Sequence, residues 1–276
     1  MENTAASPTY ALGYSEQELE RLSRQAQAFE PFTRQVLVEA GVRAGMRVLD
    51  VGCGSGDVAF LAAELVGSGG EVVGADCGSA AVEWATARAR SRGARNVKFV
   101  LGDPALLKFD QPFDAVVGRL VLMYYPEPAD AIRRLAAHIR PGGVIAFQEF
   151  DIANARSHPA APTFDQCVRW IKQGLVAAGA RTQLGLELHS MFAEAGLPAP
   201  TLRMDGLIGG GPENPAYALV SEVIQTVLPL LERFKIATAA EVDLPTLVQR
   251  MRDEVVACKG VTLSPALIGA WSNKPA

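Results

Sequence analysis

The 276-residue chain has few of the features that would mark a special class of protein. Its four cysteines and three histidines form no C-x-x-C pair and no H-E-x-x-H motif, so neither a zinc site nor a disulfide framework is expected. No apolar run approaches the roughly 18 residues of a membrane span. The first residues lack the charged and apolar regions of a signal peptide. We therefore expect a cytoplasmic protein with reduced thiols, no metal and no membrane span.

The charge balance excludes another class of partner. Lys and Arg number 26 and Asp and Glu number 30, which gives a formal net charge of −4, and no dense basic run occurs. A nucleic-acid partner is therefore not expected. Hydrophobic residues make up 49% of the chain and charged residues 20%, as in ordinary globular proteins. A chain of this length can bury a substantial core, as one large α/β domain or one domain with a cap.

Residues 48–57 carry the most informative pattern. A short apolar run ends in Asp50, which is typical of a buried parallel strand that reaches its carboxyl end. Gly52, Gly54 and Gly56 follow, and residues 58–65 are apolar with a helical period. Glycines let the backbone approach a ligand closely, and a helix start offers unpaired N–H groups to an anionic group. The order strand, glycine turn, helix predicts the start of a βαβ unit.

The spacing of these glycines argues against a dinucleotide. The G-x-G-x-x-G fingerprint would need glycine or alanine at position 57, which is Asp57, and its carboxylate would face a pyrophosphate unfavourably. The D-x-G-x-G-x-G form resembles motif I of the class I S-adenosylmethionine (SAM) methyltransferases, and the resemblance continues for roughly two-thirds of the chain. The alternative is a tight turn without a ligand, but such a turn does not need three glycines and an aspartate at the strand end.

Later segments continue the resemblance. Residues 71–76 and 96–101 are expected as the second and third strands, and residues 79–91 as a helix whose arginines form a solvated face. Residues 112–119 resemble the F-D-x-V strand, and the R-P-G-G turn at 140–143 precedes a strand at 144–151. The resemblance implies an α/β, Rossmann-like fold. Its expected features are a seven-stranded, mostly parallel sheet with helices on both faces, an antiparallel strand seven, and helical cap insertions.

The remaining boundaries follow from the same comparison. Two N-terminal helices are expected, one ending before Pro31 and one over 32–40. Residues 154–162 are expected as a linker, 215–258 as helical with a break at Pro229, and 261–271 as strand seven. The expected parts are a helical lid (1–44), a SAM-binding core (45–152), a helical cap segment (153–183), further core (184–213), a helical cap insertion (214–258) and a final core strand with its tail (259–276).

The resemblance also implies the cofactor contacts. They are Tyr14, Gln25, Asp50, Gly52, Cys53, Gly54, Gly56, Asp76, Cys77, Asp103, Pro104, Arg119 and Leu120. Asp76 would accept hydrogen bonds from the ribose hydroxyls, or alternatively cap the next helix. Asp103 would bind the adenine amino group, or alternatively serve as a plain turn residue. Tyr14 and Gln25 have packing as their alternative, and Arg119 is expected to use its main chain.

The expected methyl-transfer chamber lies after strand four. Leu122, Met123, Tyr124 and Tyr125 would form its wall, with core packing as the alternative and one tyrosine facing the chamber. Glu149, at the end of strand five, is the candidate general base, with a pKa raised by burial. Its alternative is a structural carboxylate bonded to the cap or the N-terminal helices. His158 and His189 are weaker candidates for the base.

These residues predict an enzyme that transfers a methyl group from SAM to a small, hydrophobic organic acceptor and releases S-adenosylhomocysteine (SAH). The acceptor atom, O, N or C, is left open. The resemblance is greatest to the group that includes ubiquinone and menaquinone C-methyltransferases and many natural-product methyltransferases. A SAM-fold protein that binds the cofactor without methyl transfer is the alternative. A homodimer is also left open.

Overall fold

The computed structural model describes residues 15–275, so the expected contact of Tyr14 lies outside the described residues. The chain divides into two compact units. The first comprises the chain up to Glu149 together with Gly185–Arg203 and the stretch that begins at Ile268. The second comprises Phe150–Leu184 and Met204–Leu267.

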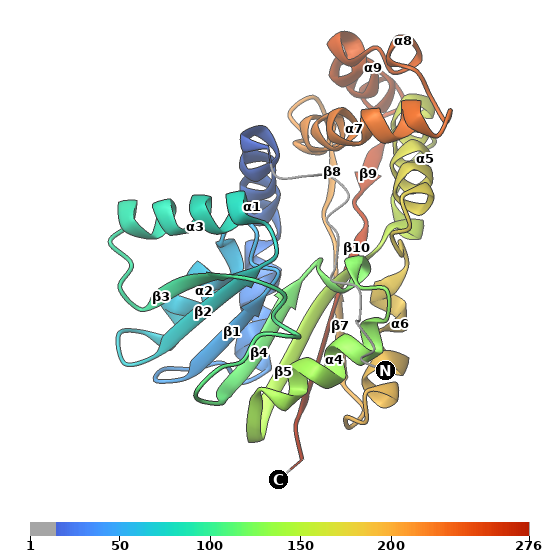
Figure 1. The fold of residues 1–276 in the computed structure, drawn as a ribbon. Helices are drawn as coiled ribbons and strands as arrows, with labels where there is room; N and C mark the ends of the chain where they lie inside the picture. Colours follow the sequence, from blue (N-terminus) through green and yellow to red (C-terminus); the bar gives the residue numbers. More distant parts are fainter. Residues whose placement is uncertain (1–14, 276) are drawn as a thin grey trace. The chain divides into compact units, whose positions relative to one another are not determined.

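The first unit is built on a seven-stranded sheet with the order β3-β2-β1-β4-β5-β10-β7 (Figure 1). Its strands are β1 (Arg47–Val51), β2 (Glu71–Asp76), β3 (Val97–Leu101), β4 (Phe113–Arg119), β5 (Ile139–Asp151), β7 (Thr201–Asp205) and β10 (Ala266–Asn273). The first five pair in parallel. Lys274, just past β10, exchanges backbone hydrogen bonds with Gly142 and Gly143 at the start of β5, so β10 runs antiparallel to β5. The Rossmann-like prediction, with its antiparallel strand, is confirmed.

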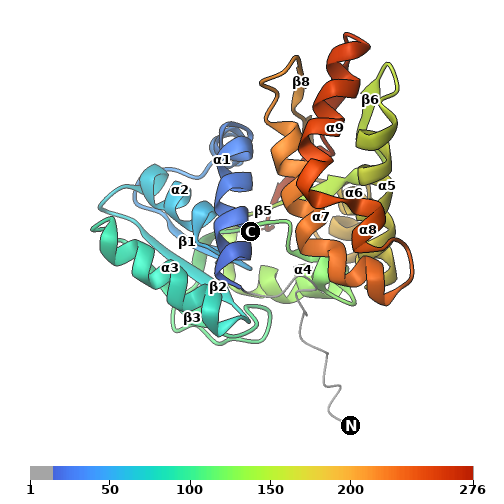
Figure 2. The same ribbon diagram turned by 90° about the horizontal axis from the view of Figure 1, so that it is seen from above.

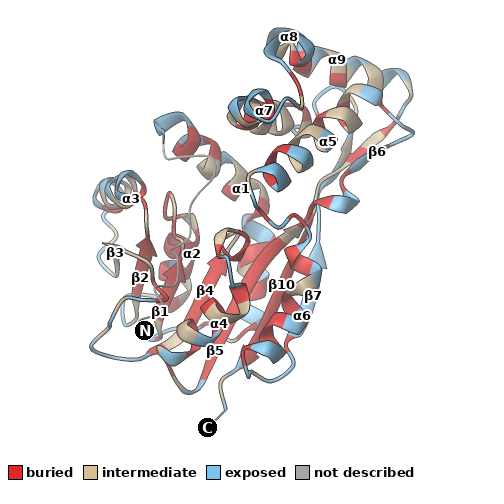
Figure 3. Cartoon of the chain, turned by 45° about the vertical axis from the view of Figure 1, so that its right-hand side comes forward, coloured by how far each residue is buried: buried red, intermediate tan, exposed pale blue. Residues whose placement is uncertain are grey.

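Burial explains why the segments inside the sheet form strands. In β1, Val48, Leu49 and Val51 are completely buried, so side chains on both faces of the sheet are covered. Figure 3 shows the same for most of the large sheet. The helices of this part of the chain are α1 (Glu16–Glu39), α2 (Asp57–Val66), α3 (Ser79–Ser91), α4 (Pro128–Ala137) and α6 (Leu184–Glu194). A 3₁₀ turn, η1 (Leu122–Tyr124), follows β4.

Helix α1 corrects one expectation. It continues through Pro31, so the two predicted N-terminal helices are one. An internal proline costs about 3 kcal/mol, because it lacks an N–H group and its ring crowds the preceding turn. Phe29, Phe32, Val36 and Leu37 are nearly fully buried around it, and each contributes about 1.5–3 kcal/mol. Burial therefore outweighs the proline, and α1 lies against α2 (Figure 2).

The second unit combines helices with a small sheet. Its helices are α5 (Pro162–Ala177), α7 (Ala216–Arg233), α8 (Ala239–Val242) and α9 (Leu244–Ala257). Helices α5, α7 and α9 pack on one another (Figure 2). Three short strands, β6 (Arg156–His158), β8 (Ile208–Gly210) and β9 (Val261–Leu263), form an antiparallel sheet with the order β6-β9-β8.

Four further expectations differ from the structure. The predicted linker at 154–162 contains β6, because its backbone pairs with β9 far along the chain. The predicted strand at 261–271 is two strands in different sheets, β9 and β10. Helix α7 continues through Pro229, since Ile224, Val227 and Leu231 are buried on both sides of it. Strand β5 begins at Ile139, so the R-P-G-G segment lies within the strand.

The four cysteines are free thiols. Between residues 15 and 275, no helix is both long and apolar enough to cross a membrane.

Candidate cofactor and active site

The glycine loop joins β1 to α2 in a conformation that requires its glycines. Gly52 has a φ of 64°, in the left-handed region that favours glycine. A Cβ atom there would lie 2.3 Å from Cγ2 of Val121, so no side chain fits. The amide of Cys53 donates to the carbonyl of Ala75 on β2, and Cys53 itself is buried. The loop is thereby fixed at the carboxyl ends of the parallel strands, where ligands of such sheets bind.

Three polar side chains share the sheet face that carries α1. Arg119 and Gln148 are cross-strand partners, and Asp50 lies opposite Val117, two residues before Arg119. Because side chains alternate between faces along a strand, all three lie on one face. The Nη1 atom of Arg119 donates to Oγ1 of Thr33 on α1 at 3.0 Å, which identifies that face.

Asp50 and Gln148 are incompletely hydrogen bonded. Asp50 is 1% exposed, and its Oδ2 atom has no partner within the described chain. Burial raises the pKa of Asp50 to about 8, with the Asp76 carboxylate adding to the effect and Arg119 opposing it. Gln148 is 3% exposed, and neither Oε1 nor Nε2 has a partner among residues 15–275. Buried polar groups are usually paired, so this face has the character of a ligand site.

The residue after β4 is strained. Leu120 has a φ of 55°, which is unfavourable for a residue with a branched side chain, and its amide donates to the carbonyl of Gln148 at 2.8 Å. Such strain occurs most often at functional sites. The expected cofactor contact at Leu120 therefore falls on an unusual piece of backbone.

Asp76 connects the glycine loop to the turn before α3. Its Oδ2 accepts from the amide of Gly54 at 2.9 Å, and its Oδ1 accepts from the amide of Gly78 at 2.8 Å. Gly78 is the N-cap residue of α3, so the second bond is a turn contact before the helix, and Asp76 is not the N-cap that the alternative held. This bond does not exclude the ribose role, because a carboxylate offers about four lone-pair positions. The charges of Asp103 and Asp76 act on half-buried Cys77, whose pKa is raised to about 11 chiefly by burial.

Asp103 and Tyr125 are joined. The hydroxyl of Tyr125 donates to Oδ1 of Asp103 at 2.8 Å, and the same oxygen accepts from the amide of Ala105 at 3.0 Å. The bond from the Ala105 amide is typical of a turn residue, which was the alternative role expected for Asp103. Pro104 is buried beside it, and its carbonyl contacts Nε2 of His138 at 3.0 Å. Tyr125 is thus held by the predicted adenine site.

Tyr124 lies among charges instead. The structure brings its hydroxyl under the influence of Glu149 and of Glu18 and Arg21 on α1. Burial is the largest cause that raises the pKa of Tyr124, and the two carboxylates add to it. Tyr124 therefore keeps its proton near neutral pH. Gln25 also lies on α1, where its Oε1 accepts from Nη1 of Arg21 at 2.6 Å.

Glu149 is completely buried, and only one of its two carboxylate oxygens is hydrogen bonded within the described chain. Its Oε1 accepts from the amides of Val121 and Leu122 at 2.8 and 2.7 Å, so it caps η1. Its Oε2 has no partner among the described residues. Burial raises the pKa of Glu149 to about 8, and the backbone N–H groups oppose this. The structural bonds thus go to the loop after β4, and not to the cap or N-terminal helices. His158 and His189 are both exposed.

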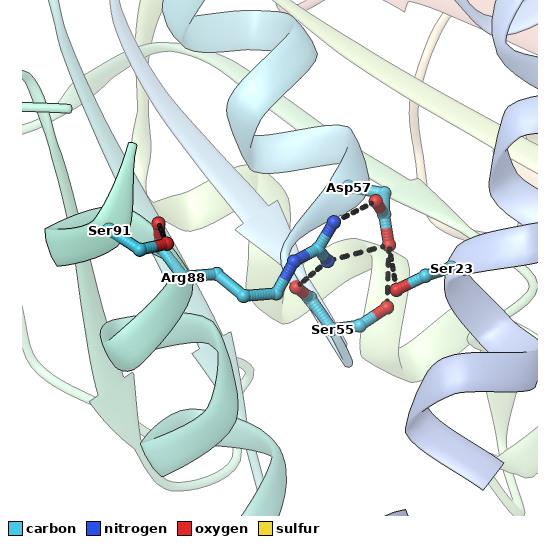
Figure 4. A network of polar contacts seen from close by, with 5 residues as sticks. All are labelled: Ser23, Ser55, Asp57, Arg88 and Ser91. Carbon is cyan, nitrogen blue, oxygen red and sulfur yellow. Dashed lines mark hydrogen bonds and ion pairs between the residues drawn. The ribbon is translucent and has the colours of Figure 1, made fainter. Parts of the chain in front are cut away.

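Two residues of this region differ from what the sequence predicts, Gln148 and Arg88. The arginines of α3 were expected on a solvated face, but the guanidinium of Arg88 binds the carboxylate of Asp57, and the two side chains are 18% and 17% exposed (Figure 4). The helical spacing carries a signal for this, because Arg88 follows the buried Ala81 and Ala85 by seven and three residues. Gln148 had none, because strand alternation alone does not reveal an unpaired amide. Within residues 15–275, no cluster of three His, Cys, Asp or Glu residues could hold a metal ion.

Several known proteins are similar to this chain in sequence. A family model described as a methyltransferase domain matches residues 43–196. Aklanonic acid methyltransferase DauC of Streptomyces sp. (strain C5) is 36% identical over 140 residues, which are 50% of this chain and 63% of that protein. Demethylmenaquinone methyltransferase of Staphylococcus aureus (strain MRSA252) is 34% identical over 134 residues, which are 48% of this chain and 52% of that protein. The match therefore spans less than two thirds of either relative.

A solved structure is similar in fold. Haemonchus contortus phosphoethanolamine N-methyltransferase 2, in complex with SAM, has a TM-score of 0.54 at 17% identity, covering 89% of this chain and 53% of that chain. The family model spans more than half of the chain and includes the glycine loop and the first five strands. The chain therefore belongs to the methyltransferase-domain family, among the class I SAM-dependent methyltransferases.

Proposed function

We propose that this chain transfers a methyl group from SAM to a small, hydrophobic organic acceptor and releases SAH. The observation that carries the proposal is the buried Asp50 oxygen without a partner, beside the glycine loop and on the same face as Arg119 and Gln148.

The residues fit this cofactor. Its amino-acid end carries an ammonium group and a carboxylate. The Asp50 carboxylate would accept from the ammonium, and Arg119 and Gln148 offer donors for the carboxylate. A cation beside Asp50 would also offset the burial that raises the pKa of Asp50. Asp76 would hold the ribose and Asp103 the adenine amino group, as the family resemblance implies.

When bound, the cofactor supplies a methyl group already activated by the sulfonium, so the chain's own work is orientation and exclusion of water. Leu122 and Met123 are buried and provide an apolar wall. Tyr124, which keeps its proton, would line the same wall. Where the acceptor must lose a proton, the Oε2 atom of Glu149 would take it, and this requires the ionised carboxylate.

The acceptor class follows from the relatives and the wall. Their names indicate aklanonic acid and demethylmenaquinone as acceptors of those proteins. For this chain we propose a hydrophobic phenol or an activated carbon acceptor in natural product biosynthesis, with Glu149 as the base. We also propose that the protein is cytoplasmic. Light scattering tests whether it forms a homodimer.

Calorimetric titration with SAM and SAH, with NAD as the control, tests the cofactor. Micromolar binding of SAM and SAH alone supports the proposal, whereas binding of neither refutes it. A screen of phenols and quinols that detects SAH release then tests the transfer. If SAM binds and no SAH is released with any acceptor, the protein uses the fold without methyl transfer.

A further inference from the structure

The residue that argued against a dinucleotide, Asp57, is the centre of a polar cluster. Asp57 is the first residue of α2, directly after Gly56. Its Oδ1 accepts from Nη2 of Arg88 at 2.8 Å, and its Oδ2 accepts from Nη1 of Arg88 at 3.1 Å and from Oγ of Ser55 at 2.6 Å. Oγ of Ser23, on α1, lies 3.4 Å from the same oxygen (Figure 4). One carboxylate thus connects three helices and the glycine loop.

Arg88 also binds the loop itself. Its Nη1 donates to the backbone carbonyl of Ser55, and its guanidinium lies 5.3 Å from the ring centre of Phe60 on α2. The Arg88 and Asp57 side chains are only 18% and 17% exposed. A two-pronged, partly desolvated ion pair of this kind is stronger and more directional than an exposed one.

The loop needs such support. Ser55 stands between Gly54 and Gly56, whose φ angles of 51° and 88° are left-handed. Glycine adopts many other conformations at little cost, so an unsupported loop would spread over several of them. Asp76 holds the Gly54 amide on one side. Arg88 holds the Ser55 carbonyl on the other, and Asp57 holds the Ser55 hydroxyl. The affinity of a ligand falls by the fraction of the protein that is not in the binding conformation.

We propose that Arg88 is a positioning residue for the cofactor, which keeps the glycine loop in its binding conformation through Ser55 and Asp57 and seats α1 beside it through Ser23. This inference rests on the proposed function, because it concerns SAM affinity. In this role Arg88 acts on the loop and not on the cofactor. Its contribution is the order of the loop before binding.

The chain provides a matched control. Arg92 is one helical turn further on, and its guanidinium lies 4.5 Å from the centre of the same Phe60 ring, but no hydrogen bond joins it to the loop among the described contacts. R92A removes an arginine and its stacking from the same site. R88A likewise removes one arginine and its contact with the Phe60 ring, and it also removes the hydrogen bonds to the loop. R88K keeps the charge without the planar fork and covers the case in which R88A does not fold.

The test measures the dissociation constant of SAH and the hydrogen exchange of the ligand-free loop amides at 52–57. We expect R88A to weaken SAH about tenfold, R88K to weaken it less, and R92A to leave it unchanged. Loop exchange should be faster in R88A, faster to a smaller extent in R88K and unchanged in R92A. The KM for SAM should rise in R88A with little change in the KM for the acceptor. Equal effects of R88A and R92A, or unchanged loop exchange in R88A, would overturn the inference. Failure of the wild type to bind SAH would instead refute the proposed function.

Discussion

Replacing Asp50 by asparagine should make the ligand-free protein more stable, although it should abolish tight cofactor binding. Asparagine has nearly the same size and carries no charge. The pKa of Asp50 is raised by burial from 3.8 to about 8 in the folded chain. The folded state therefore holds a proton that the unfolded state releases above pH 3.8, and the stability due to Asp50 falls as the pH rises from there to about 8.

The magnitude follows from the pKa difference. Each unit corresponds to about 1.4 kcal/mol, so the ionisable Asp50 lowers the free energy of unfolding by about 3 kcal/mol at pH 6 and by about 5 kcal/mol at pH 8. D50N should remove this term. The stability difference between D50N and the wild type should therefore widen by about 2 kcal/mol between pH 6 and pH 8.

Urea unfolding followed by circular dichroism at the two pH values measures that difference. Glu149 titrates in a similar range, but it is present in both proteins and cancels in the comparison. A difference that stays constant with pH, or a D50N protein that is less stable at both pH values, would refute the argument that Asp50 is buried without compensation. Calorimetry with SAH gives the second readout, and undiminished binding by D50N would remove Asp50 from the site.

Three other substitutions test the site. E149Q should lower turnover about a hundredfold to ten-thousandfold if the acceptor loses its proton to Glu149. Turnover of the wild type should then rise with pH through the Glu149 pKa of about 8, and unchanged turnover in E149Q would mean that Glu149 is not the base. G52A should lower stability by about 1–3 kcal/mol in urea unfolding, and by more than G45A, because Gly45 shares the positive φ but no atom lies near its Cβ position; equal losses would contradict the close approach of Val121. Q148M should raise the unfolding free energy of the ligand-free protein by about 1–3 kcal/mol, because it removes a buried amide without hydrogen-bond partners. It should also weaken SAH binding in calorimetry, and a destabilised variant would mean that the amide has a partner.

Local chemistry made the cofactor half of the fold predictable. The strand before Asp50, the glycine positions and helix 79–91 each depend on residues near in sequence, and the structure places all of them as expected. Strand β6 was not predictable, because three residues carry no clear alternation and Ser157 finds its partner only at Thr262. The proline in α1 misled for a related reason, since the burial that offsets it comes from tertiary contacts.

The directions of the side chains at the site could not be predicted from the sequence. The sequence identifies Tyr124 and Tyr125 as neighbours after strand four, but only the folded chain shows that Tyr125 turns to Asp103. Likewise, the burial of Glu149 was expected, but its bonds to the amides of Val121 and Leu122 depend on the path of the loop. The ionic partner of Arg88 is 31 residues away, beyond any local pattern.

The positions of β9 and β10 have a consequence for biosynthesis. β9 lies between β6 and β8, and β10 lies between β5 and β7, so residues 261–273 supply an interior strand to each sheet. Neither sheet can close while those residues are still inside the ribosome, and the edges of β5, β6, β7 and β8 then present unpaired backbone groups. Until residues 261–273 emerge, a nascent chain of this protein should therefore expose these strand edges to chaperones and proteases.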